Sequence, residues 1–195
     1  REAMALLNRA LQISPDYAEA YAALAYCEAQ RAVFGWVEDP AAAVQRAETA
    51  ARRALAADSP GASARALGVL ASLHTFTRDY DAALAEADRA IDLNASDAFA
   101  HSLRGGALMW LGRIPESIAA SEAARRYDPR LASEANFNLG MAYYLGGRYR
   151  DALNAFNESL RYEPEIVFLQ AGRASAAAQL GDQAQAAQAA ASVRR

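Results

Sequence analysis

Residues 132–165 read ASEANFNLGMAYYLGGRYRDALNAFNESLRYEPE, and this segment decides the fold of the chain. In its first half, apolar residues recur at helical spacings on more than one side, which predicts a helix with neighbours on two sides. Gly146 and Gly147 end that helix, because glycine tolerates the left-handed conformation common after a helix C-terminus. A second helix begins at about Tyr149 and ends before Pro164. The segment therefore predicts a helix-turn-helix pair, with Tyr149 wedged between its two helices.

The pattern of this segment recurs along the chain at a step of 34 or 35 residues. The glycines before the second helix and the small residues after its start keep this step, and Pro129 and Pro164 close successive units. A period of this length indicates supersecondary units stacked in one dimension, because a single unit cannot bury its apolar face alone. The positions equivalent to the start of the second helix are Tyr80, Ile114, Tyr149 and Gln183.

The repeated motif resembles the tetratricopeptide repeat. That family has Leu-Gly, Tyr, Gly-x-Tyr, Ala, Phe and Pro in fixed order along a helix-turn-helix unit. The resemblance implies an all-α, right-handed superhelical solenoid of antiparallel helix-turn-helix repeats, whose function is protein binding without catalysis. The residues that carry it in the segment 132–165 are Leu139, Gly140, Tyr143, Gly147, Tyr149, Ala152, Phe156 and Pro164.

The resemblance divides residues 1–195, taken as one domain, into six parts. Residues 1–17 match only a second helix, and because the sequence starts at Arg1 within a helical pattern we expect a segment of a longer protein. Residues 167–195 form a terminal repeat or cap. The parts are a half repeat at 1–17, a repeat with an insertion near 33–40 at 18–61, repeats at 62–97, 98–131 and 132–166, and the terminal repeat.

The insertion near 33–40 has two recognisable features. Asp39 followed by Pro40 predicts an N-cap and a proline in the first helical turn, so a helix restarts there. Trp36 lies in the connection before it. We interpret Trp36 as a plug for the widened gap between helices, with an exposed binding anchor as the alternative.

Composition and charge narrow the possible function classes. The net charge is -3 and no run of basic residues occurs, which argues against a nucleic-acid surface. No window approaches the ~20 apolar residues that a membrane span requires, and no signal segment opens the chain. The single cysteine, Cys27, excludes an internal disulfide and suits a cytoplasmic location.

The sequence shows no catalytic constellation. His74 and His101 fall at repeat positions where packed side chains are expected, and Cys27 on its apolar helix is interpreted as a buried small hydrophobe. No cluster has metal-ligand spacing, and the glycine pairs lack the Lys and Ser/Thr of a phosphate-binding loop. We therefore predict no enzyme activity, metal or cofactor for this segment, although an upstream domain could be catalytic.

In tetratricopeptide repeat arrays the first helices line a concave groove, and the resemblance implies which residues face it. The middle repeats place aromatic residues and methionines there, which favours an apolar peptide or partner helix. The alternative is that Phe99, Phe137 and Phe168 pack between neighbouring repeats. The predicted partner-binding residues are Tyr26, Arg65, Phe99, Met109, Phe137, Asn138, Met141, Tyr144 and Phe168.

Three further hypotheses concern the biological role. The half repeat exposes an apolar edge with Leu7, Leu11 and Ile13, which a second copy could cover to form a homodimer. The same groove could instead sense a small molecule. Residues 51–129 loosely resemble the C-terminal repeat regions of bacterial adenylate cyclases and winged-helix transcriptional regulators, which implies a regulatory segment of a larger bacterial protein.

Overall fold

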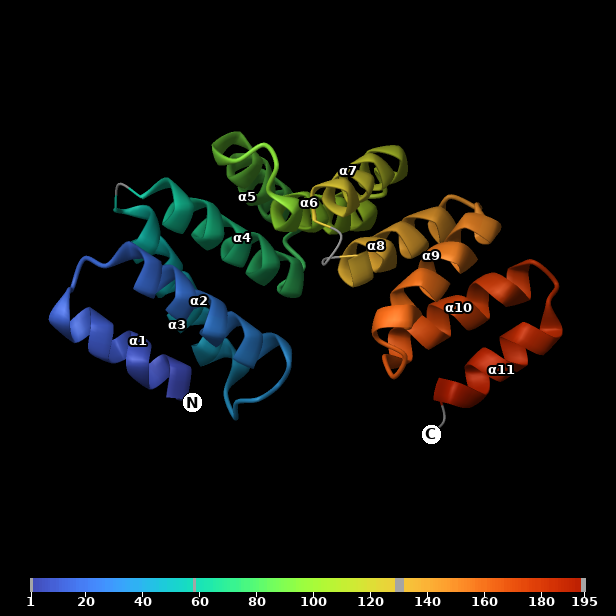
Figure 1. Ribbon diagram of the computed structural model, residues 1–195, viewed down its shortest axis with the longest axis horizontal. Coiled ribbons are helices and arrows are strands. Elements are labelled where there is room, and N and C mark those ends of the chain that lie inside the picture. Colours follow the sequence, from blue (N-terminus) through green and yellow to red (C-terminus); the bar gives the residue numbers. More distant parts are fainter. Residues whose placement is uncertain (1, 58, 129–131, 194–195) are drawn as a thin grey trace. The chain divides into compact units, whose positions relative to one another are not determined.

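The computed structural model describes residues 2–57, 59–128 and 132–193, and all regular structure in these ranges is α-helical (Figure 1). The chain separates into two compact units, Arg1–Ser96 and Asp97–Arg195. The predicted all-α architecture is confirmed. The right-handed superhelical course and the division of one domain into six parts stay predictions, and Pro129 lies outside the described residues.

Within each unit the helices form consecutive pairs that pack on the next pair. Unit 1 consists of α1 (Glu2–Ile13), α2 (Ala18–Val33), α3 (Pro40–Leu55), α4 (Pro60–Phe76) and α5 (Tyr80–Leu93). Unit 2 consists of α6 (Ala98–Trp110), α7 (Ile114–Tyr127), α8 (Ala132–Leu145), α9 (Tyr149–Tyr162), α10 (Val167–Gln179) and α11 (Gln183–Val193).

The turns inside the helix pairs follow from the glycines of the repeat. Gly112, Gly147 and Gly181 have φ of 74°, 73° and 78°, a left-handed conformation that residues with a β-carbon rarely adopt. Arg78 stands at the same repeat position in the turn between α4 and α5 and has φ of 65°. The predicted end of the helix at the glycines after Leu145 is confirmed. The turn at Arg78 has the same left-handed backbone conformation without a glycine.

The helix starts are fixed by local capping chemistry. Asp39 accepts a hydrogen bond from the backbone N–H of Ala42 at 2.9 Å, and Pro40 begins α3, as predicted. Asp79 and Asp97 cap α5 and α6 in the same way. These carboxylates satisfy N–H groups that the first helical turn leaves without partners.

The interpretation of Trp36 as a plug is wrong. Its side chain is 69 % exposed and stacks on Phe34, with the ring centroids 5.0 Å apart. The contact between α2 and α3 is already made by alanines and by an ion pair between Arg46 and Glu28. Gly35, with φ of 66°, turns the chain after α2, and the aromatic pair stays on the surface.

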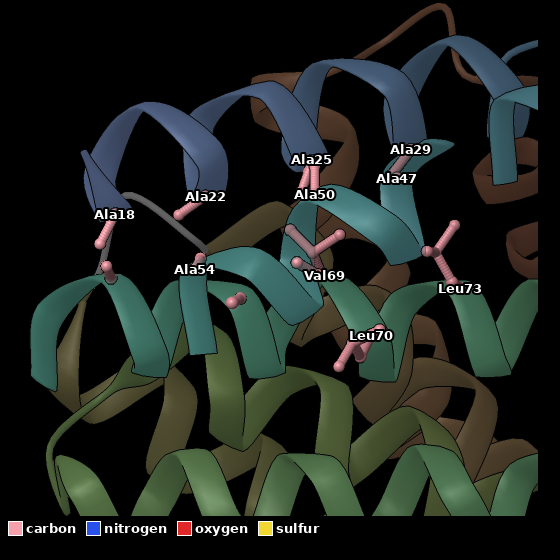
Figure 2. Packing of buried hydrophobic residues seen from close by; sticks show 13 residues of the cluster. Ala18, Ala22, Ala25, Ala29, Ala47, Ala50, Ala54, Val69, Leu70 and Leu73 are labelled. Atoms are coloured by element: carbon pink, nitrogen blue, oxygen red, sulfur yellow. The ribbon is translucent and has the colours of Figure 1, made fainter. Parts of the chain in front are cut away.

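Alanines form most of the core of unit 1. In Figure 2 the labelled alanines come from α2 and α3, and the labelled residues of α4 are Val69, Leu70 and Leu73. Small side chains let the helix backbones approach closely, but each buries little apolar area. Stability therefore comes from many modest contacts.

The core of unit 2 is built around one large ring. Phe156 of α9 is fully buried, and an added β-carbon would lie 2.6 Å from its ring at Gly140 of α8 and 2.6 Å at Gly172 of α10. The ring therefore occupies space that two glycines leave open. Tyr149, predicted to wedge between its helices, is half-buried and meets Tyr144 of α8 edge to face at 5.4 Å.

We predict that Gly140→Ala lowers the free energy of unfolding by about 1–3 kcal/mol, because the new methyl group overpacks against Phe156. Gly106→Ala in α6 is the matched control. The β-carbon added at position 106 would meet no atom closer than 3.7 Å. The higher helix propensity of alanine should therefore raise the free energy of unfolding by about 0.5–1 kcal/mol. Urea denaturation of both variants measures the difference. Equal stability of the two variants would contradict the Phe156 packing.

Candidate partner-binding surfaces

The first helices of the pairs in unit 2 are α6, α8 and α10, and α8 contacts both of the others. These three helices carry most of the predicted partner-binding residues. Phe137, Met141 and Tyr144 recur along one side of α8, and Phe168 lies in the first turn of α10. We call these four residues the aromatic face. The three α8 side chains are half-buried and pack on the Phe156 core.

Within the aromatic face, Phe137 packs on the core and Phe168 is largely exposed to solvent. The Phe137 ring lies 6.5 Å from that of Phe156 and meets Phe168 edge to face at 4.9 Å. Phe168 itself is 57 % exposed. Phe137 thus packs between neighbouring repeats, whereas the exposed part of the Phe168 ring remains available to a partner.

Two of the predicted residues belong to the interior instead. Met109 is 3 % exposed, so its side chain offers no surface to a partner. Asn138 is also buried, and its Nδ2 donates to the backbone oxygen of Ser102 at 3.0 Å and to the Ser102 hydroxyl at 3.2 Å. This amide joins α8 to α6, because a buried polar group needs such partners.

The remaining predicted residues are distributed over both units. Phe99 is half-buried in α6, close to the start of unit 2. In unit 1, Tyr26 of α2 is 44 % exposed and Arg65 of α4 is exposed. The pKa of Glu19 is lowered mainly by a hydrogen bond from Ser59, with a smaller contribution from Arg65, so Arg65 lies near the N-terminal end of α2.

The sequence analysis missed a second surface of unit 2. A cleft of about 480 Å³ lies among α7, α8 and α9, and polar groups and tyrosine rings line it. We call it the polar cleft. Its lining residues are Arg125, Asn136, Tyr143, Asp151, Asn154, Ala155, Glu158 and Tyr162.

Tyr143 is fixed in one wall of the polar cleft. Its hydroxyl donates to Glu122 at 3.2 Å, and the Arg148 guanidinium lies 4.4 Å from its ring centroid. Burial, followed by the negative charge of Glu122, raises the pKa of Tyr143. Arg148 also binds Asp151 at 2.8 Å, which raises the pKa of that guanidinium.

The predicted structural residues lie as follows. The imidazole of His101 packs on Tyr127 with centroids 5.2 Å apart, and Cys27 is half-buried rather than buried.

Among the described residues, no group of three or more His, Cys, Asp or Glu side chains is placed to hold a metal ion. None of the helices described is both long enough and apolar enough to cross a bilayer.

Two segments of the chain match the family model of the tetratricopeptide repeat, at residues 64–97 and 133–166. These two segments are tetratricopeptide repeats. A relative from Mycosarcoma maydis, the small glutamine-rich tetratricopeptide repeat-containing protein 2, is 30 % identical over 103 residues. This match covers 53 % of the chain and 29 % of the relative, so the chain spans less than a third of that protein.

Solved structures of other proteins share the tetratricopeptide repeat fold. MamA from Desulfovibrio magneticus RS-1 matches with a TM-score of 0.65 and 17 % identity, over 89 % of this chain and 93 % of that one. YrrB, described as having an unusual peptide-binding site, matches with a TM-score of 0.63 and 16 % identity, over 96 % and 90 %. These likenesses show the fold, and the repeats support a protein–protein interaction scaffold.

We predict that Tyr143 makes stability depend on alkaline pH. Because the folded state raises its pKa above the ordinary value of 10.0, its contribution is complete below about pH 10 and is lost as the pH rises through the folded value. The variant Tyr143→Phe has no phenolic hydroxyl at this position to titrate. Its free energy of unfolding should therefore fall less than that of the unmodified protein as the pH rises through this range. Denaturant titrations of both proteins at several pH values test this, and equal losses in the two proteins would contradict it.

Proposed function

We propose that the aromatic face of unit 2 binds an apolar peptide or the apolar side of a partner helix. The observation that carries this proposal is Phe168, which is held edge to face by Phe137 yet leaves more than half of its surface in solvent. A large ring that is oriented by the core but not covered by it is typical of a binding anchor. Met141, one turn after Phe137 on α8, has a flexible side chain that adapts to partners of different shape.

The size of the aromatic face suits recognition of a short segment. Fully burying one large apolar side chain contributes about 1.5–3 kcal/mol, and the three α8 residues supply further half-buried area. An amphipathic helix presents apolar residues three and four positions apart, a spacing that matches Phe137, Met141 and Tyr144 on α8. Phe99 of α6 is proposed to extend this surface.

In unit 1, we propose that Tyr26 and Arg65 contribute exposed contacts of their own. The wider role proposed is a regulatory segment of a larger bacterial, cytoplasmic protein, such as an adenylate cyclase or a transcriptional regulator. Its support is the loose sequence resemblance of residues 51–129. The description of YrrB as a protein of similar fold with a peptide-binding site supports peptide recognition as the mode.

Self-association is a second candidate function, and α1 is the feature that favours it. None of the α1 residues described is fully buried, and Leu6 and Ile13 are 63 % and 78 % exposed. Leu7 and Leu11 are half-buried, because α1 packs on α2. A mass in solution that rises with protein concentration, and that Ile13→Asp lowers to one chain, would support this function.

We predict that Phe168→Glu weakens peptide binding at least about tenfold, because it places a charge where an apolar group would be buried. The probe is a set of 12-residue peptides selected from a random library on the immobilised protein. Fluorescence anisotropy gives the dissociation constants. We expect selected peptides to carry apolar residues three and four positions apart.

The matched control is Phe34→Ala in the connection after α2, an aromatic of similar exposure in unit 1 that belongs to neither the aromatic face nor the polar cleft. This variant should bind the peptides as the unmodified protein does. Thermal unfolding should show both variants folded, since both side chains are largely in solvent. Peptides that bind the Phe168→Glu variant as tightly as the unmodified protein would refute the proposal.

A further inference from the structure

The polar cleft contains a buried group whose hydrogen bonds the chain leaves incomplete. Asn136 of α8 is 0 % exposed, and its Nδ2 has no hydrogen-bond partner among the described residues. Its Oδ1 accepts a 3.4 Å hydrogen bond from Arg125, which directs the two donor hydrogens of Nδ2 elsewhere. A buried donor without an acceptor destabilises the fold, so its retention needs a physical reason.

Unit 1 has a cleft at the same repeat positions, and there the chain satisfies its own polar groups. This cleft, of about 690 Å³, lies among α1, α2 and α3. The Glu28 carboxylate in it is 5 % exposed and accepts from Arg46 at 3.1 and 3.2 Å and from Arg31 at 3.1 Å. Guanidinium groups from the chain itself therefore satisfy the buried carboxylate of the unit 1 cleft.

The two clefts carry opposite charges at equivalent positions. When the repeats are aligned on their small residues, Arg46 and Arg53 of α3 correspond to Asp151 and Glu158 of α9. Glu28 of α2 corresponds to Tyr143 of α8. The unit 1 cleft thus has basic groups over a buried acid, whereas the polar cleft has acidic groups beside a neutral tyrosine and supplies no cation of its own on α8.

We propose that the polar cleft binds a basic amino-acid residue, with its ammonium or guanidinium group at Asp151 and Glu158 and its carbonyl or carboxylate oxygen at Asn136 and Arg125. The tyrosine rings of the lining contact the aliphatic part of the side chain and favour the cation. The ligand's oxygen accepts from Nδ2 of Asn136, which completes the hydrogen bonds of that amide.

The carboxylates of the polar cleft are able to accept a further cation. Asp151 uses Oδ2 to pair with Arg148, and Glu158 uses Oε2 to pair with Arg161 at 3.0 Å. Each carboxylate keeps a second oxygen, and ion pairs as exposed as these contribute little to stability. They therefore offer little resistance to a ligand that shares or displaces the arginine.

The size of the cleft fits this ligand class. Its volume of about 480 Å³ lies in the range of small-molecule sites, about 300–1,000 Å³. A single basic residue fits in such a space, and a folded partner domain does not. The polar cleft lies among α7, α8 and α9, whereas the aromatic face lies on α8 and α10, so the two sites are separable by mutation.

The test is an NMR titration of the isotope-labelled protein with two probes, free L-arginine and N-acetyl-L-arginine amide. We expect a saturable shift of the Asn136 side-chain amide signal with a dissociation constant on the order of 1 mM. Tighter binding of the free amino acid indicates a free ligand whose carboxylate reaches Arg125. Tighter binding of the amide indicates a residue within a polypeptide, and both results support the proposal.

The matched controls test whether the ligand's charge and the cleft's carboxylates carry the binding. Citrulline has nearly the shape of arginine without its charge, so L-citrulline and its acetylated amide should bind at least about tenfold more weakly. The double variant Asp151→Asn and Glu158→Gln should weaken arginine binding at least about tenfold and keep its thermal stability, because both side chains are partly in solvent. Phe168→Glu should leave arginine binding unchanged. No saturable shift, equal binding of citrulline, or unchanged binding by the double variant would overturn the proposal.

Discussion

The close approach of helices at small residues is the constraint on which the structure depends. In unit 1 the contacts among α2, α3 and α4 are made mainly by buried alanines, and in unit 2 the ring of Phe156 fits only where Gly140 and Gly172 have no β-carbon. Packing of this kind has little tolerance, since a single added methyl group meets an occupied position. It fixes the register of α9 between α8 and α10, and both candidate sites depend on that register.

A helix with neighbours on several sides can serve two surfaces. Along α8, Leu139 and Ala142 are fully buried, Phe137 and Met141 belong to the aromatic face, and Asn136 lies in the polar cleft. Consecutive residues of a helix point about 100° apart, so adjacent residues reach different environments. The near-uniform apolar pattern read from residues 132–145 reflects this position of α8 and does not by itself identify which side binds a partner.

The sequence predicted what depends on local chemistry. The turn at Gly147, the N-cap at Asp39 and the start of α3 at Pro40 follow from backbone preferences of those residues, and the structure contains all three. It did not predict the burial of Met109 or the exposure of Trp36. A repeat position gives the direction of a side chain from its helix, but its exposure depends on the volume of side chains from other helices. The polar cleft was missed for the same reason, because three helices contribute to it.

The unpartnered amide of Asn136 contrasts with two other buried polar groups, which the chain satisfies. Asn138, two residues later, donates to Ser102, and the buried Glu28 of unit 1 accepts from two arginines. The same backbone therefore satisfies buried polar groups where the sequence supplies partners. In a stacked fold each repeat depends mainly on its neighbours, so a local cost of about 1–3 kcal/mol in one repeat is tolerated without loss of the whole. The unpartnered amide lies in a cleft with acidic groups on α9 and hydrogen-bond donors on α7 and α8. Binding of a ligand accounts for its retention better than packing does.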